Sequence, residues 1–126
     1  MPVRGIRGAI TVTANTPAAI LSATTELLTA VMRANPTLKS KDLASVIFSI
    51  TDDLHAEYPA KAARQMGWEH VPLFCTREIP VPGGLPLCIR VLLHWNTRLS
   101  QSAIHHVYLK DAARLRPDLA VSEPDV

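Results

Sequence analysis

The sequence has few cysteines, no long apolar run and no block of like charge, and each shortage argues against a class of protein. Its two cysteines, Cys75 and Cys88, lack CxxC spacing, which argues against a disulfide framework and against a zinc site. No apolar run approaches the ~20 residues that a membrane-spanning helix needs. The N-terminal stretch MPVRGIRGAITV lacks the pattern of a signal peptide. We therefore expect reduced thiols, no membrane partner and a cytoplasmic location.

The charged residues argue against a nucleic-acid partner. The nine arginines and four lysines are scattered along the chain, and the net charge is only +2. Proteins that follow a phosphate backbone usually carry a Lys/Arg block, which is missing here. The five histidines lack the spacing of metal ligands, and there is neither a GxGxxG nor a P-loop pattern. These residues predict neither a metal site nor a nucleotide cofactor.

What the sequence does contain is a mixture of strand and helix patterns over the length of one domain. At 126 residues the chain suits a single domain, 1–126. Mostly apolar residues at helical spacing follow Thr16–Pro17 and predict a helix that ends before Asn35–Pro36. A short second helix is expected over 59–67. Strands are expected at 3–12, 46–51, within 69–81, at 87–95 and, as a strand or helical turn, within 102–119.

This order of elements predicts an α+β domain in which helices cover one face of a mixed sheet. Within the fourth strand, the run LCIRVLLHW places Arg90 among apolar residues. Alternation assigns Arg90 to the more polar face, and the other face is wholly apolar: Ile89, Val91, Leu93 and Trp95. A buried guanidinium requires an anionic partner. An internal salt bridge and an anionic ligand fit the strand pattern about equally well.

Other residues add candidates without deciding between them. Arg7 and Arg116 also lie in semi-apolar settings, which favours a small ligand with more than one carboxylate. Glu78 and Tyr108 offer an acceptor and a hydroxyl, although a solvated strand-end glutamate and a core tyrosine are the simpler interpretations. Cys75 suggests a thiol nucleophile paired with a histidine, but no local catalytic signature surrounds it, and an inert strand cysteine is favoured.

Five separated segments, in one order, carry a family resemblance over about residues 3–120: VRGIRGAITV, DLHAEYPAKAAR, GWEHVP, GGLPLCIRV and HVYLKDAARLRPDL. Together they resemble the monofunctional chorismate mutases of the Bacillus type. The resemblance implies a mixed sheet with helices on one face and a homotrimer that forms a pseudo-α/β barrel, with active sites between subunits. It also implies the rearrangement of chorismate to prephenate, toward phenylalanine and tyrosine, with no cofactor and no metal.

The resemblance assigns roles to the candidates already noted. It implies that Arg90 donates to the breaking ether oxygen and to a carboxylate of the substrate. Arg7 and Tyr108 match residues that bind substrate carboxylates. Glu78 matches the acidic residue near the ring hydroxyl, and Cys75 matches a polar contact beside it. Because alternation would place Cys75 and Glu78 on opposite faces, we expect a bulge, a strand end or a main-chain contact at one of them.

Further residues match parts of the family site outside this group. The neighbouring subunit is expected to contribute Tyr58, Ala60, Lys61 and Arg64. Leu73 and Phe74 are further expected substrate contacts. Leu115 and Arg116 begin a flexible tail, from about residue 115, that is expected to fold over the site. At the position of Phe74 one member of this family has a small polar residue, and at the position of Tyr58 the same member has Phe. Neither change removes a charge, so we expect effects on affinity or packing.

Two other functions remain compatible with the sequence. The chain could be a non-catalytic trimeric protein that binds a small anion on the same scaffold, because a fold does not fix a function. It could also be a thiol-dependent enzyme that uses Cys75. The presence of Arg7, Glu78 and Arg90 together favours the mutase, because a non-catalytic descendant would be expected to lose the cation at the ether oxygen first.

Overall fold

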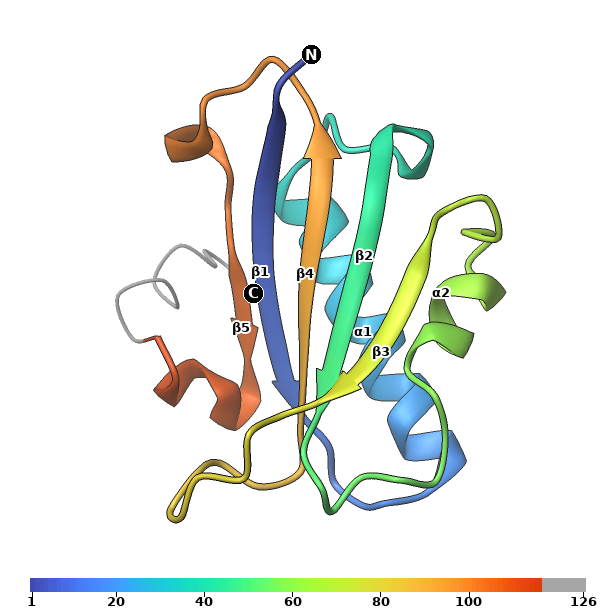
Figure 1. The fold of residues 1–126 in the computed structure, drawn as a ribbon, viewed down its shortest axis with the longest axis vertical. Coiled ribbons are helices and arrows are strands. Elements are labelled where there is room, and N and C mark those ends of the chain that lie inside the picture. Colours follow the sequence, from blue (N-terminus) through green and yellow to red (C-terminus); the bar gives the residue numbers. More distant parts are fainter. Residues whose placement is uncertain (117–126) are drawn as a thin grey trace.

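A five-stranded mixed β-sheet forms the centre of the fold in the computed structural model, which describes residues 1–116 (Figure 1). The sheet has the order β3-β2-β4-β1-β5. The long strand β4 pairs antiparallel with both β1 and β2, whereas β5 joins β1 and β3 joins β2 in parallel. The strands are β1 Val3–Thr11, β2 Leu43–Ile50, β3 Leu73–Arg77, β4 Cys88–Asn96 and β5 Val107–Leu109.

Two helices, α1 (Pro17–Ala34) and α2 (Ala60–Gln65), lie on the same side of the sheet (Figure 1). The start of α1 is fixed by Thr16, whose side-chain oxygen accepts a hydrogen bond from the Ala19 N–H at 3.1 Å. The helix ends at Asn35, which caps it and whose side-chain amide donates to a carbonyl of the last turn. Three short 3-10 turns complete the fold: Ser40–Asp42, Gln101–Ala103 and Lys110–Arg114.

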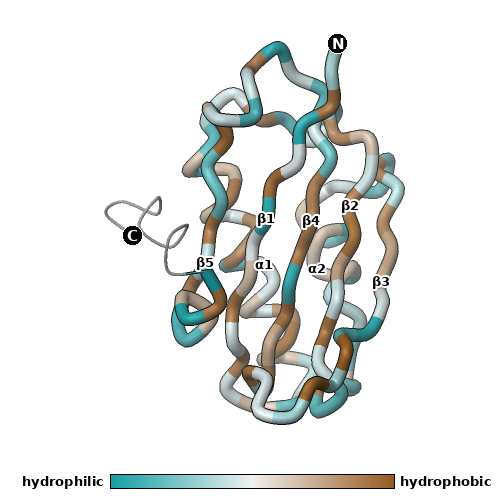
Figure 2. Tube along the Cα trace, turned by 60° about the vertical axis from the view of Figure 1, so that its left-hand side comes forward, coloured by the Kyte–Doolittle hydropathy of each residue, from teal (hydrophilic) through white to brown (hydrophobic). Residues whose placement is uncertain are grey.

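The main core lies between the sheet and these helices. The apolar residues of β4 that alternate with Arg90 all face it, and each is at most 4% exposed: Ile89, Val91, Leu93 and Trp95. Burying one such side chain contributes roughly 1.5 to 3 kcal/mol. Figure 2 shows hydrophobic and hydrophilic positions interleaved along the strands, which is the alternation expected of a sheet with one buried face.

Residues 1–116 leave the other face of the sheet largely uncovered. Within this range the turn after β5 folds back over it, where Ala112 packs with Ala9, Cys88 and Tyr108 in a second, smaller apolar cluster. Leu115 packs against the same cluster. The open face therefore begins beside this cluster and extends across the middle of the sheet.

The predicted α+β fold is confirmed, with its mixed sheet and its helices on one face, and the trimeric barrel stays a prediction. The segment within 102–119, which was predicted to be either a strand or a helical turn, contains both, because β5 leads directly into a 3-10 turn. Residues 117–126, which include most of the expected tail, lie outside the described residues. Among residues 1–116, no helix is long and apolar enough to cross a membrane.

Candidate active site

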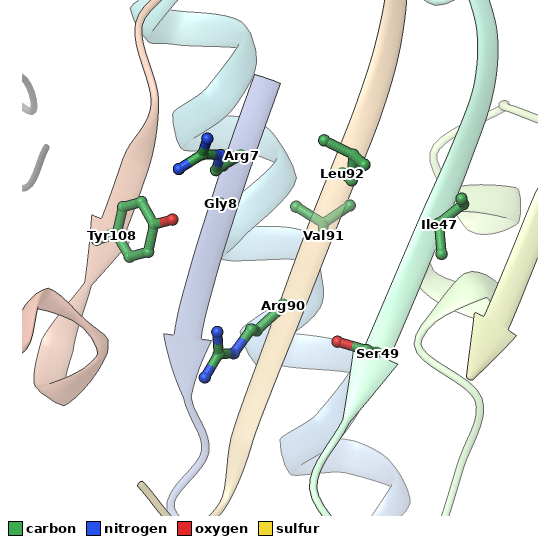
Figure 3. Close-up of a pocket in the computed structure, with 8 residues that line it drawn as sticks. All are labelled: Arg7, Gly8, Ile47, Ser49, Arg90, Val91, Leu92 and Tyr108. Carbon is green, nitrogen blue, oxygen red and sulfur yellow. The ribbon is translucent and has the colours of Figure 1, made fainter. Parts of the chain in front are cut away.

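A hollow of about 250 Å³ lies on the open face, across strands β5, β1, β4 and β2 (Figure 3). Its polar side chains come from four strands: Arg7, Ser49, Arg90 and Tyr108. The register pairs Ala9 with Arg90, so Arg7 and Arg90 are offset by two positions on neighbouring strands. The rest of the lining is apolar or backbone: Gly8, Ile47, Val91 and Leu92. Two cations thus share a small surface whose positions are set by the sheet.

Arg90 has a carboxylate beside it. Its Nε lies 3.6 Å from Oε2 of Glu78. Ser49 is the direct cross-strand partner of Arg90, and its hydroxyl donates a hydrogen bond to the same Oε2. In Figure 3 the Arg90 side chain extends from β4 toward β1, over the face on which Arg7 and Tyr108 also lie. The ion pair is formed through Nε, and within residues 1–116 neither Nη group donates a hydrogen bond to Glu78.

Arg90 is partly exposed in the single chain, so its charge is not buried there. Its side chain is 44% exposed, and that of Glu78 is 23% exposed. The physical reason is that the helices cover the opposite face, while the described part of the chain places no element over Arg90. Both interpretations of Arg90 have a counterpart in the structure, because it pairs with an internal acid and also faces an open hollow.

Arg7 and Tyr108 approach the hollow from the β1–β5 side. The backbone N–H of Arg7 donates to Nδ1 of His106 at 2.9 Å. Burial lowers the pKa of His106, and the charges of Arg7, Arg116 and His105 lower it further. Tyr108 is only 8% exposed, yet its hydroxyl points toward β1 in the hollow (Figure 3). The charges of Arg7 and Arg116 thus both act on His106.

A second hollow, of about 340 Å³, lies at the other edge of the sheet between α2 and β3. It brings together six of the expected contacts, which we call the α2–β3 group: Tyr58, Ala60, Arg64, Leu73, Phe74 and Cys75. Tyr58 and Phe74 are 68% and 65% exposed. Lys61 does not line this hollow; its Nζ lies 3.3 Å from Oε1 of Glu57.

The cysteines are poor nucleophiles at neutral pH. Burial raises the pKa of Cys75, against the opposing effects of a backbone hydrogen bond from Ala60 and the charge of Arg64. Burial raises the pKa of Cys88 to about 11. A raised pKa disfavours the thiolate that a thiol mechanism requires.

In the single chain Cys75 and Glu78 lie on different faces, as alternation alone would place them. Cys75 packs against the helix-side core and lines the second hollow, and β3 stops at Arg77. Glu78 follows the strand; its N–H donates to the carbonyl of Ile50 at 3.0 Å. The expected arrangement that brings Cys75 beside Glu78 stays a prediction.

Sequence reasoning missed three side chains of the first hollow: Ile47, Ser49 and Leu92. Alternation along β2 and β4 did place them on the face opposite the core, which was the available signal. Alternation alone does not give the pairing of β2 with β4, which sets Ser49 opposite Arg90.

Four residues carry the charged groups and the tyrosine hydroxyl of the site, and we call them the sheet-face group: Arg7, Glu78, Arg90 and Tyr108. Two cations, one carboxylate and a hydroxyl suit an anionic ligand that must be oriented. No group of three or more His, Cys, Asp or Glu side chains suited to a metal ion occurs within residues 1–116. The two hollows share no lining residue.

Comparison with known proteins places this arrangement in a family. The family profile described as "Chorismate mutase type I" matches residues 3–119. The chain is 56% identical to "Chorismate mutase AroH" of Thermus thermophilus over 117 residues, covering 93% of this chain and 96% of the relative. It is 45% identical to "Chorismate mutase AroH" of Bacillus subtilis (strain 168) over 124 residues, covering 98% and 97%.

A solved structure agrees with these relatives. The structure of a chorismate mutase from Clostridium thermocellum matches with a TM-score of 0.85 and 46% identity, over 87% of this chain and 97% of that one. The family profile, the sequence identities and the shared fold each extend over nearly the whole chain. This chain belongs to the chorismate mutase type I family.

Proposed function

We propose that the protein converts chorismate to prephenate in the cytoplasm, in a site that joins the sheet-face group of one subunit to the α2–β3 group of its neighbour in a homotrimer. The reaction is an isomerisation in aromatic amino acid biosynthesis. The observation that carries the proposal is the position of Arg90: a permanently charged side chain on a central strand, facing an open hollow that also holds Arg7 and Tyr108.

The chemistry of the rearrangement explains why a cation is useful and a nucleophile is not. One ether C–O bond breaks while one C–C bond forms, so no proton is transferred and no covalent enzyme intermediate is needed. As the C–O bond breaks first, negative charge grows on the ether oxygen. A guanidinium already fixed beside that oxygen stabilises the transition state more than the ground state. We assign this role to Arg90.

The other members of the sheet-face group orient the substrate. Arg7 and Tyr108 supply donors for the two carboxylates of chorismate, whose flexible side chain must be held over the ring for the carbons to meet. Glu78 is assigned to the ring hydroxyl and to the positive charge that develops on the ring. Leu115 and Arg116 start a tail that we propose closes over the bound substrate.

Three features support a site shared between subunits. The hollow of about 250 Å³ is smaller than the roughly 300 to 1,000 Å³ typical of ligand sites, so it needs a further wall. The α2–β3 group supplies a cation, Arg64, and exposed aromatic rings on a separate surface. The two groups line separate hollows within one chain, which leaves each group free to meet the other group of a neighbouring subunit. We place Lys61 with the α2–β3 group through its charge, although it pairs with Glu57 in the single chain.

The proposal is tested by adding the purified protein to chorismate and following the loss of its ultraviolet absorbance. Prephenate is identified by acid conversion to phenylpyruvate. Arg90→Ala should lower kcat by at least about 100-fold, the usual cost of losing one preorganised donor, while the oligomer stays intact. A well-folded wild-type protein that leaves chorismate unchanged would instead support a non-catalytic protein that binds a small anion.

A further inference from the structure

The end of strand β2 holds Glu78 at two points. The backbone N–H of Glu78 donates to the carbonyl of Ile50 at 3.0 Å, and the Ser49 hydroxyl donates to Oε2 of its carboxylate. Ile50 belongs to the core, whereas Ser49 is half-buried on the open face. The carboxylate therefore takes its position from β2, although Glu78 itself lies in the loop after β3.

Ser49 and Arg90 use the same oxygen of Glu78. Arg90 approaches Oε2 through Nε, at 3.6 Å, which is longer than a hydrogen bond of ordinary strength. Among the described residues, the other oxygen, Oε1, has no hydrogen-bonding partner. An arginine and a carboxylate free to adjust would favour the bidentate arrangement, in which both oxygens meet the guanidinium fork. Here the pair is held apart from that arrangement.

We propose that Ser49 is a positioning residue that keeps Glu78 from closing onto Arg90; this rests on the proposed function. The hydroxyl anchors Oε2, so Oε1 remains directed to the ligand and the Nη groups of Arg90 remain available. Without the hydroxyl, Glu78 rotates into a bidentate pair with Arg90. The pair then neutralises the cation and turns both groups away from the substrate.

The test compares Ser49→Thr with Ser49→Val, because these side chains have the same shape and differ in the hydroxyl. Ser49→Thr should keep kcat within about threefold of wild type, and Ser49→Val should lower kcat at least about tenfold, with a smaller change in KM. Ser49→Ala, which adds no bulk, should follow Ser49→Val. Thermal unfolding of each variant at one protein concentration gives the structural control.

A second comparison separates positioning from a general structural effect. In a Glu78→Ala background there is no carboxylate to position, so Ser49→Thr and Ser49→Val should differ by less than about twofold in kcat. An equal difference with and without Glu78 would overturn the proposal, as would a Ser49→Val enzyme with wild-type kcat.

A crystal structure of Ser49→Val gives a readout that does not depend on activity. It should show both oxygens of Glu78 paired with Arg90. An unchanged Glu78 would overturn the positioning role even if the wild type proved inactive toward chorismate. Inactivity of the wild type, with the side chains rearranged as expected, would contradict the proposed function alone.

Discussion

At the scale of single residues, the charged side chains of the open face owe their positions to contacts of the backbone. Arg90 is carried by a strand paired on both sides, and the N–H of Arg7 donates to His106. Glu78 is attached through its own N–H to the end of β2. Preorganisation of this kind matters because a group that must move into place during the reaction loses part of its stabilising effect.

The state of Cys75 leads to a prediction at this scale. Because burial raises its pKa, Cys75 is a neutral thiol at pH 7, and we expect iodoacetamide to react with it slowly and faster as the pH rises above 8. Cys88, 1% exposed, should be unreactive in the folded protein and serves as the internal control. Mass spectrometry of digested protein measures both.

The same cysteine also separates the mutase from a thiol enzyme. Cys75→Ala should keep kcat/KM within about tenfold of wild type, since it removes one weak polar contact and no nucleophile. A loss of activity comparable to that of Arg90→Ala, together with rapid alkylation at pH 7, would contradict the role assigned to Cys75.

The sequence was sufficient to predict which face of β4 carries Arg90, because alternation depends only on neighbours along the chain. It was not sufficient to place Glu78 beside Arg90. That contact depends on where β3 ends and on the register between β2 and β4, which arise from long-range pairing. Alternation also marks the wholly apolar face of β4 as the face that the helices cover, which leaves Arg90 on the open face.

At the scale of elements, β1 is the strand that joins the two sides of the site. It pairs with β4 on one side and β5 on the other, and it approaches α1 closely at Gly8. A Cβ added there would lie 3.1 Å from Cγ1 of Val91, 3.2 Å from Cδ1 of Leu27 and 3.3 Å from the carbonyl oxygen of Val107. The glycine thus permits the close contact between strand and helix.

Gly8→Ala should destabilise the protein by roughly 1 to 3 kcal/mol through overpacking. Gly5→Ala is the matched control on the same strand, because its added Cβ would meet nothing closer than Cδ1 of Leu92 at 3.7 Å. Thermal or urea unfolding at one protein concentration measures the difference. Equal stability of the two variants would show that β1 and α1 can move apart at no cost.

The contact between β1 and His106 predicts a dependence of stability on pH. Nδ1 accepts the Arg7 N–H only when it carries no proton, and the pKa of His106 is lowered in the folded chain, first by burial. The unfolded state therefore binds this proton more readily, and stability should fall as the pH drops below the ordinary histidine value of about 6.5.

His106→Asn tests this dependence, because the amide oxygen can accept the same N–H and does not titrate. The melting temperature of the variant, measured between about pH 5 and 8 at constant protein concentration, should fall less on acidification than that of wild type. Parallel curves for the two proteins would mean that another group causes the acid sensitivity.

At the scale of the whole molecule, the single chain carries two separate groups of candidate site residues. The sheet-face group lies on the uncovered face, and the α2–β3 group lies at the β3 edge of the sheet with its aromatic rings exposed. Nothing in the sequence pattern distinguishes a strand face that meets another subunit from one that meets solvent. The fold places the two groups in separate hollows, and their union across a subunit boundary is our proposal.

The most direct test of this account is complementation between two inactive variants, Arg7→Ala and Arg64→Ala, co-expressed with different tags and purified as mixed oligomers. If each site takes its sheet-face group from one subunit and its α2–β3 group from the next, every mixed trimer regains one of its three sites, about a third of the total. Co-expressing Arg7→Ala with Arg90→Ala is the matched control and should restore none, because both changes damage the same group. Recovery of chorismate turnover in the first mixture alone is the predicted result; equal turnover in both mixtures, or none in either, would contradict a site shared between subunits.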